Sequence, residues 1–302
     1  MDEKKYLNEF KKKYTYQDIK DYIDRIKDLS IAIAGETIID EYVYGKTLGK
    51  AGKFPIVAFQ NESIERYEGG IRAIYNHLKS YSDKVSIATR SPAIVKRRYV
   101  QNGQKLFETY YHESIEPSLV NDLNKFNLIV MSDFGHDYFN KATINNIYSK
   151  DIFKCLNTQF NAGNEGLNTI NKYNKDADYI CIDAHELRLA FSNIEDSLER
   201  ILDYWKDKNA VVSITDSFKG CIVYHKGNIC KIPAFAKDVV DSTGAGDTFL
   251  AITSPLVYMD APIEVVGFIG NCAGAIACSY QGNKEDVDKE RLLLFIKSLY
   301  ED

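Results

Sequence analysis

The sequence predicts an α/β fold in which a mostly parallel sheet is covered by helices on both faces, a three-layer α/β/α sandwich. Short apolar runs rich in β-branched residues alternate with segments of helical periodicity along the chain. Strands that alternate with helices need crossover connections, which place helices over both faces of a parallel sheet. The apolar runs span residues 31–34, 85–88, 128–132, 179–183 and 211–215.

The composition is that of an ordinary globular protein. With 45% hydrophobic residues among 302, the chain can bury one large core. Its net charge of −5 argues against a nucleic-acid or membrane-surface partner, because such partners need a concentrated basic face. Residues 1–30 lack the apolar core of a signal peptide, so we expect a cytoplasmic protein. The six cysteines form no C-x-x-C pair, and we expect reduced, mostly buried thiols rather than a metal site.

The chain begins with a segment that precedes the first predicted strand. In residues 4–28, apolar side chains such as Tyr6 and Phe10 recur mainly at intervals of three and four, which predicts one or two amphipathic helices. We therefore expect residues 1–30 to form a helical extension that packs against the main domain, residues 31–302.

Two segments interrupt the alternation of strands and helices. Residues 41–66 and 95–111 alternate apolar and polar positions, and the second contains the hairpin signal Asn102-Gly103. We expect antiparallel strands that form a small flap beside the main sheet. A polar flap over the carboxyl ends of parallel strands can act as a lid on a ligand, although the pattern also fits an edge extension without a ligand.

An asparagine-rich stretch, residues 157–174, lies between two candidate strands at 155–157 and 179–183. Such a composition is typical of a solvated loop. The stretch nevertheless leaves the sheet at the edge where folds of this class bind ligands. A ligand-binding loop and a solvated loop both remain open.

The stretch VVDSTGAGDTFLA, residues 239–251, predicts an anion site at the start of a helix. Gly244, Ala245 and Gly246 follow a β-branched pair and precede an apolar helical run, so they fall at the helix N-terminus. Backbone N–H groups at this position have no partner inside the helix, and the helix dipole adds positive potential.

Asp247 stands beside this anion site, which needs an explanation. Two unit charges about 4 Å apart repel by roughly 1 to 4 kcal/mol in watery to near-surface surroundings. Phosphoryl transfer would justify the arrangement, because the amides stabilise the moving phosphoryl group while the carboxylate accepts the proton of the attacking hydroxyl. The alternative is that Asp247 is a first-turn acid whose charge interacts favourably with the helix dipole and has no catalytic role.

The segment DSTGAGDTF resembles the C-terminal signature of the ribokinase-like (PfkB) carbohydrate kinases. Four further segments resemble the same family in the same order, nearest to its D-glycero-β-D-manno-heptose-7-phosphate kinase branch. They are GETIIDEYVYG (35–45), EGGIRA (68–73), VKRRYVQNGQKLF (95–107) and VMSDFGHDYF (130–139). The resemblance implies a ribokinase-like sandwich with a small β lid, and Asp247 as the catalytic base. It also implies that the amides of Gly244, Ala245 and Gly246 form the anion hole.

The resemblance also implies which residues contact the acceptor sugar. In the family, an aspartate after the first strand and a glycine pair lie against the sugar, and in this branch a basic pair on the lid could meet a substrate phosphate. Solvated lid charges are the alternative for that basic pair. The matching acceptor-side positions are Asp40, Gly69, Gly70, Lys96, Arg98, Asp133 and His136.

The family uses ATP and Mg²⁺, and the matching positions can be placed here. Asp183-Ala184-His185-Glu186 corresponds to an Asn-x-x-Glu element that orders magnesium and its water shell, so Asp183 and Glu186 are the candidate metal-side residues. The matching nucleotide-binding positions are Thr215, Lys219, Gly220 and Asn271.

Departures from the family pattern concern the acceptor. Ala73 stands where an asparagine usually follows the glycine pair, and His136 stands where the heptose-phosphate branch has a lysine. Compared with most members of the family, the chain lacks about two dozen residues after Thr89, and this shortening would open one side of the acceptor pocket. The leading hypothesis is an ATP- and Mg²⁺-dependent kinase of a sugar or sugar phosphate that forms a homodimer through its lid. The alternative is a non-catalytic nucleotide or sugar-phosphate binding module.

Overall fold

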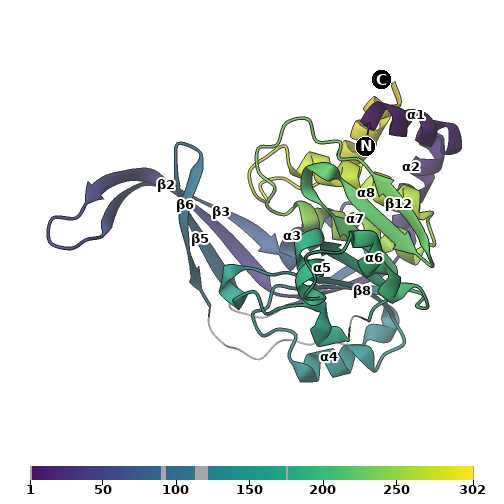
Figure 1. Cartoon of the computed structure of the whole chain (residues 1–302), viewed down its shortest axis with the longest axis horizontal. Helices are drawn as coiled ribbons and strands as arrows, with labels where there is room; N and C mark the ends of the chain where they lie inside the picture. Colours follow the sequence, from purple (N-terminus) through teal and green to yellow (C-terminus); the bar gives the residue numbers. More distant parts are fainter. Residues whose placement is uncertain (1, 90–92, 113–121, 175, 302) are drawn as a thin grey trace.

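Eight strands build the main sheet, and a separate four-stranded sheet projects from one side of it (Figure 1). The computed structural model describes residues 2–89, 93–112, 122–174 and 176–301. Short runs of β-branched and aliphatic residues form the central strands, and all five predicted runs lie within strands of the main sheet.

The main sheet has the strand order β12-β11-β10-β9-β8-β7-β1-β4. Pairing is parallel from β10 through to β4, and it is antiparallel only where β11 and β12 extend the edge. The α/β prediction is therefore confirmed. The strands are β1 Ile31–Gly35, β4 Val85–Thr89, β7 Leu128–Asp133, β8 Phe153–Thr158, β9 Tyr179–Asp183, β10 Val211–Thr215, β11 Cys221–His225 and β12 Asn228–Ile232.

Helices cover both faces of the sheet, so the main body has three layers (Figure 1). Each face of the sheet has its own cluster of buried apolar residues. On strand β1, Ile31 and Ile33 belong to the first cluster, whereas Ala32 and Ala34 belong to the second. The first cluster holds α1 Glu3–Lys13, α2 Tyr16–Arg25, α3 Ile71–Leu78, α7 Ala245–Tyr258, α8 Ile263–Ala277 and α9 Lys289–Glu301. The second holds α4 Lys141–Tyr148, α5 Ala184–Ala190 and α6 Leu198–Leu202. None of the helices in the described ranges has the length and apolar character that a membrane span needs.

The N-terminal segment forms two helices, and both pack into the first apolar cluster. The ring of Phe10 on α1 stacks on Phe268 of α8 with 4.2 Å between ring centroids. Thr15 caps α2 in a reciprocal capping box with Asp18. The two ends of the chain lie side by side (Figure 1), and the hydroxyl of Tyr300 donates to a backbone carbonyl of the N-terminal segment at 2.8 Å.

The flap is the four-stranded sheet, in the order β3-β2-β5-β6. Its hairpins pair β2 Thr37–Lys50 with β3 Val57–Gly70 and β5 Ile94–Gln101 with β6 Gln104–Tyr111. The prediction of antiparallel strands is correct within each hairpin but wrong between them, because β2 and β5 run parallel. The physical reason is that β2 and β5 follow β1 and β4, which are themselves parallel neighbours in the main sheet.

The asparagine-rich stretch starts inside β8, which ends at Thr158, and then carries two short 3₁₀ helices. These are η3 Ala162–Asn164 and η4 Ile170–Tyr173. Further 3₁₀ turns are η1 Ile26–Asp28, η2 Leu123–Lys125, η5 Asp203–Trp205 and η6 Ser217–Lys219. The stretch thus connects the carboxyl end of one parallel strand to the next, where ligands bind in such sheets.

Candidate active site

A cavity of about 480 Å³ opens between the N-terminus of α7 and the carboxyl ends of β9 and β10. A volume of this size is within the range of small-molecule sites. The sequence-predicted residues that line it are Asp183, Glu186, Thr215, Gly220, Gly244, Ala245, Gly246, Asp247 and Asn271. The structure therefore brings together the predicted base, the anion hole, the metal-side pair and three of the four nucleotide-side residues.

The N-terminus of α7 has the backbone that an anion site requires. Gly244 has a φ of 85°, in the left-handed region, and a Cβ there would overlap the side-chain oxygen of Asn283. The N–H of Ala245 donates to the carbonyl oxygen of Ser242 at 3.2 Å. The amides of Gly244 and Gly246 are therefore the better donors for a bound anion, a refinement of the predicted three-amide anion hole.

Asp247 lies in the first turn of α7 and its side chain is almost completely buried. The side-chain amide of Gln159 donates to Asp247 Oδ1 at 2.8 Å. Burial, together with the nearby charge of Asp40, raises the pKa of Asp247 to about 7, although Lys96 and Gln159 oppose the rise. A carboxyl group with a pKa near neutrality is suited to general-base chemistry.

The flap brings Asp40 and Arg98 together, and the charge of Asp40 acts on Asp247. Asp40 on β2 is buried and accepts a hydrogen bond from the guanidinium of Arg98 on β5. A Cβ at Gly69 would overlap the Asp40 carboxylate, so this position needs glycine. Gly70 has a φ of 59° and precedes the first residue of α3. These predicted acceptor-side residues therefore gather at the junction of lid and main sheet.

Lys96 is a nearly buried cation on the same lid strand. Its ammonium group lies 5.4 Å from the ring centroid of Tyr110. Burial lowers the pKa of Lys96, which the charge of Asp40 partly opposes. An anionic group bound beside Lys96 would compensate this buried charge.

The carboxylate of Asp133 and the backbone N–H of His136 both form hydrogen bonds with residues outside the cavity at α7. Asp133 is fully buried and accepts hydrogen bonds from Lys172 Nζ and the hydroxyl of Tyr173, both at 2.7 Å. The backbone N–H of His136 donates to the Glu36 carboxylate at 3.1 Å. The structure therefore places the Asp133 carboxylate in a structural network, away from the cavity at α7.

The nucleotide side of the cavity is formed by β10, η6 and α8. The side-chain amide of Asn271 donates to the carbonyl oxygens of Ile232 and Pro233 at 3.1 and 2.8 Å. Phe218 also lines the cavity and is 84% exposed, and its apolar ring was not among the predicted residues. Lys219 does not line the cavity, and its ammonium group pairs with Asp216 at 2.9 Å.

Asp183 and Glu186 form the N-terminal cap of α5. Asp183 Oδ1 accepts from the N–H of His185 at 2.7 Å, and Glu186 accepts from the N–H groups of Asp183 and Phe160 at 3.2 and 3.0 Å. Burial raises the pKa of Glu186 to about 7. The part of the chain that the structure describes contains no cluster of three or more acidic, histidine or cysteine ligands. Two carboxylates offer oxygen acceptors of the kind that the water shell of a hydrated Mg²⁺ can contact, since Mg²⁺ keeps several waters.

Contacts between distant segments hold the site together, and the sequence did not predict them. Lys105 on β6 places its ammonium group 3.0 Å from both carboxylate oxygens of Asp241 and 3.2 Å from the hydroxyl of Thr243. The lid is thereby tied to the segment that leads into the anion hole. No local motif signals this contact, because Lys105 and Asp241 are 136 residues apart.

A buried histidine on α3, His77, holds the first turn of α7 through hydrogen bonds. The N–H of Val287 donates to His77 Nδ1 at 3.0 Å, so Nε2 carries the proton and donates to the hydroxyl of Thr248 at 2.9 Å. Thr248 in turn donates to the carbonyl oxygen of Gly244 at 3.0 Å. This chain of hydrogen bonds links α3, which follows the glycine pair, to the anion hole.

Comparison with known proteins agrees with this geometry. The family model described as pfkB family carbohydrate kinase matches residues 83–290. The bifunctional protein HldE of Actinobacillus pleuropneumoniae is 20% identical over 311 residues, which cover 86% of this chain and 62% of that protein. Fructokinase-2 of Zea mays is 30% identical over 116 residues, 36% of this chain and 34% of that protein. The chain thus spans less than two thirds of these curated relatives.

Solved structures show the same fold. Ribokinase of Thermotoga maritima superposes with a TM-score of 0.69 at 16% identity, covering 89% of this chain and 99% of that one. A ribokinase of Arabidopsis thaliana, solved with ribose and ATP, gives 0.68 at 16% identity with the same coverage. Because the family model matches more than half of the residues, the chain belongs to the pfkB family of carbohydrate kinases.

Proposed function

We propose that the protein is an ATP- and Mg²⁺-dependent kinase that phosphorylates a hydroxyl of a sugar or sugar phosphate. The observation that carries the proposal is the position of Asp247, a buried carboxylate with a pKa near 7 in the first turn of α7. It shares one cavity with the amides of the anion hole and with Thr215, Gly220 and Asn271 on the nucleotide side. Phosphoryl transfer needs such a base next to a site that binds the moving phosphate.

In the proposed reaction, Asp247 accepts the proton of the acceptor hydroxyl as its oxygen attacks the γ-phosphoryl group. The amides of Gly244 and Gly246 stabilise the negative charge on the transferred group. Gln159 holds the carboxylate in place through its 2.8 Å hydrogen bond. Bound Mg²⁺ would neutralise phosphate charge, and Asp183 and Glu186 would hold its water shell.

An acceptor that itself carries a phosphate is favoured, as in a heptose phosphate. Lys96 and Arg98 place two cations on the acceptor side of the lid, and Lys96 lacks an ion pair with any other described residue. A phosphate on the acceptor would complete this arrangement. Ala73 is buried in α3 and provides no amide for the sugar, so the sugar itself must be recognised by other groups.

The direct test is turnover of ATP with a panel of heptose, hexose and pentose phosphates, read by detection of the phosphorylated product. A kinase yields product with at least one acceptor. The second candidate function is a binding module, which Ala73 and the short segment after Thr89 favour. Binding of ATP and Mg²⁺ without product from any acceptor would favour the module.

The pH dependence follows from the pKa of Asp247. The base works when ionised, and its pKa of about 7 means that kcat/KM should fall about tenfold per pH unit below neutrality. Lys96 lowers this pKa, so Lys96→Met should move the acid limb to higher pH. A pH–rate profile of both proteins checks the prediction. A profile that is flat between pH 5 and 8, or a limb that moves to lower pH in the variant, would contradict it.

Dimerisation through the lid is part of the proposal. Four large apolar side chains at the tip of the β2–β3 hairpin are 59 to 67% exposed: Leu48, Phe54, Ile56 and Val57. Exposed strands and apolar side chains of this kind favour association with a second copy. Light scattering is expected to give about twice the chain mass of 34.4 kDa at micromolar concentration, and Phe54→Lys to shift the mass toward the monomer. A monomeric mass for the unmodified protein would count against the dimer.

A further inference from the structure

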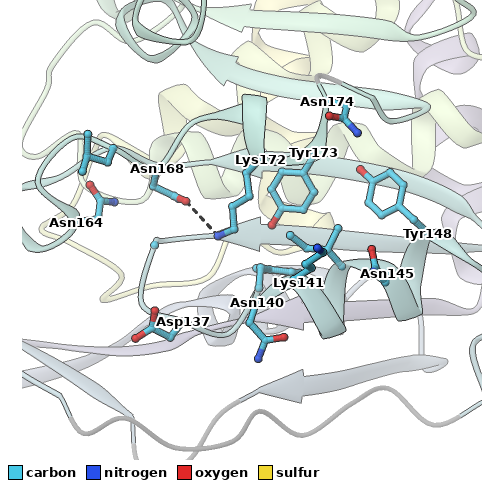
Figure 2. A pocket seen from close by; sticks show the side chains of 14 residues that line it. Asp137, Asn140, Lys141, Asn145, Tyr148, Asn164, Asn168, Lys172, Tyr173 and Asn174 are labelled. Carbon is cyan, nitrogen blue, oxygen red and sulfur yellow. Dashed lines mark hydrogen bonds between the residues drawn. The ribbon is translucent and has the colours of Figure 1, made fainter.

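A second cavity, of about 720 Å³, lies outside the candidate active site (Figure 2). Its walls are the loop after β7, helix α4 and the asparagine-rich segment from Asn164 to Asn174. It shares no lining residue with the cavity at α7. Its volume is in the range of small-molecule sites. Neither the proposed reaction nor the acceptor side of the lid uses it.

The polar side chains of this cavity are amides, two cations, two tyrosine hydroxyls and one carboxylate. Lys141 and Lys172 line it from opposite walls, on α4 and η4, and Asp137 is the one lining carboxylate among the described residues (Figure 2). Lys172 is partly engaged, with Asp133 at 2.7 Å and Asn168 at 3.3 Å. Lys141 makes no ion pair with the described residues. Lys172 is thus neutralised by Asp133, and Lys141 is the lining cation that an anionic ligand can pair with.

The remaining lining groups suit a sugar. The side chains of Asn145 and Asn174 make no hydrogen bond to other described residues, and amide groups both donate to and accept from hydroxyls. Apolar surface is present as well, because Ile144 lines the cavity and Leu167 at its rim is 79% exposed. Amides, cations and apolar side chains in one concave site are the combination that a small polar ligand needs.

We propose that this cavity is a second binding site, for a phosphorylated sugar whose phosphate is bound by Lys141 and Lys172 and whose hydroxyls contact the asparagine amides. The site is separate from the acceptor site, where Lys96 and Arg98 provide the cations. Its occupancy requires no turnover, so it does not depend on the proposed kinase activity.

The hydrogen bonds of the cavity wall decide which residue to change in a test. Asn164 and Asn168 donate to the carbonyl oxygen of Gln159 at 2.7 and 3.3 Å, and Gln159 holds Asp247. Changes at these asparagines, or at Lys172, would therefore disturb the active site as well. Lys141 is exposed at the first residue of α4 and has no such connection, so Lys141→Glu tests the cavity alone.

The experiment is a calorimetric titration of the full chain with glucose 6-phosphate, inorganic phosphate and glucose at low salt. We expect glucose 6-phosphate to bind more tightly than either inorganic phosphate or glucose. Lys141→Glu should weaken its binding at least tenfold. Lys150→Glu, a charge reversal just beyond the other end of α4, should leave it unchanged. Lys96→Met should remove only the binding at the acceptor site and leave the Lys141-dependent binding in place.

Three results would overturn the proposal. The first is no binding of glucose 6-phosphate at millimolar concentration. The second is binding that Lys96→Met abolishes and Lys141→Glu leaves intact, which would assign the ligand to the acceptor site. The third is equal affinity for glucose 6-phosphate and inorganic phosphate, which would show that the amides do not recognise a sugar. Thermal unfolding of each variant verifies that the substitutions leave the fold intact.

Discussion

Replacing Asp247 by asparagine is expected to lower kcat by about 10²- to 10⁴-fold with any acceptor that the unmodified protein phosphorylates. Asparagine keeps the shape of the side chain, but its amide cannot accept the proton of the attacking hydroxyl. Gly244 and Gly246 still offer their amides to the phosphate, so binding of ATP should be weakened little or even strengthened by the loss of a nearby negative charge. Product formation and equilibrium binding of ATP with Mg²⁺ measure the two effects separately.

The matched control for this substitution lies at the other end of α7. Asp260 is exposed, just beyond the helix, and its φ of 54° is one that asparagine also adopts readily. Asp260→Asn changes the net charge equally and should leave kcat unchanged. If Asp247→Asn retained more than a tenth of the turnover, the assignment of Asp247 as the base would fail, whatever the ATP affinity.

The fold was largely predictable because the decisive signals are local. Most of the parallel strands are short runs rich in β-branched residues, and the alternation with helices allows few topologies. The pairing of β2 with β5 was not predictable in the same way. The polar alternation of each hairpin indicates its own strands, whereas the direction of β2 against β5 depends on β1 and β4 being parallel neighbours.

The residues of the candidate site also differ in how far local sequence could identify them. The segment from Gly244 to Asp247 acts through its own backbone and first helical turn, so the sequence alone could identify it. Gln159 and Asn283 reach Asp247 and Gly244 from remote segments. The composition of residues 157–174 indicates a possible ligand-binding loop, but it does not single out Gln159, and no pattern indicates Asn283. Lys219 is the reverse case: the sequence names it, whereas the structure pairs its ammonium group with a near neighbour, Asp216.

The N-terminal helices illustrate how structure changes the meaning of an amphipathic pattern. The spacing of apolar residues in this segment predicted that the helices pack against the main domain, but not how deeply their side chains are buried. Side chains of α1 and α2 are fully buried within the same apolar cluster as the strands and helices of the main domain, among them Phe10, Ile19 and Ile23. We therefore propose that the two helices are a structural part of the main domain, and that their loss would expose the outer face of α8.

Replacing Phe10 by alanine is accordingly expected to lower the free energy of unfolding by about 3 to 5 kcal/mol, the usual range for a buried phenylalanine. The ring is completely buried and lies against Phe268 and Tyr14, with centroids 4.2 and 5.0 Å away, so its removal leaves a cavity between α1 and α8. Denaturant unfolding of this variant and of Lys12→Ala, an exposed position on the same helix, measures the difference. A loss below about 1 kcal/mol for Phe10→Ala would mean that the N-terminal helices are only loosely attached and that the main domain folds without them.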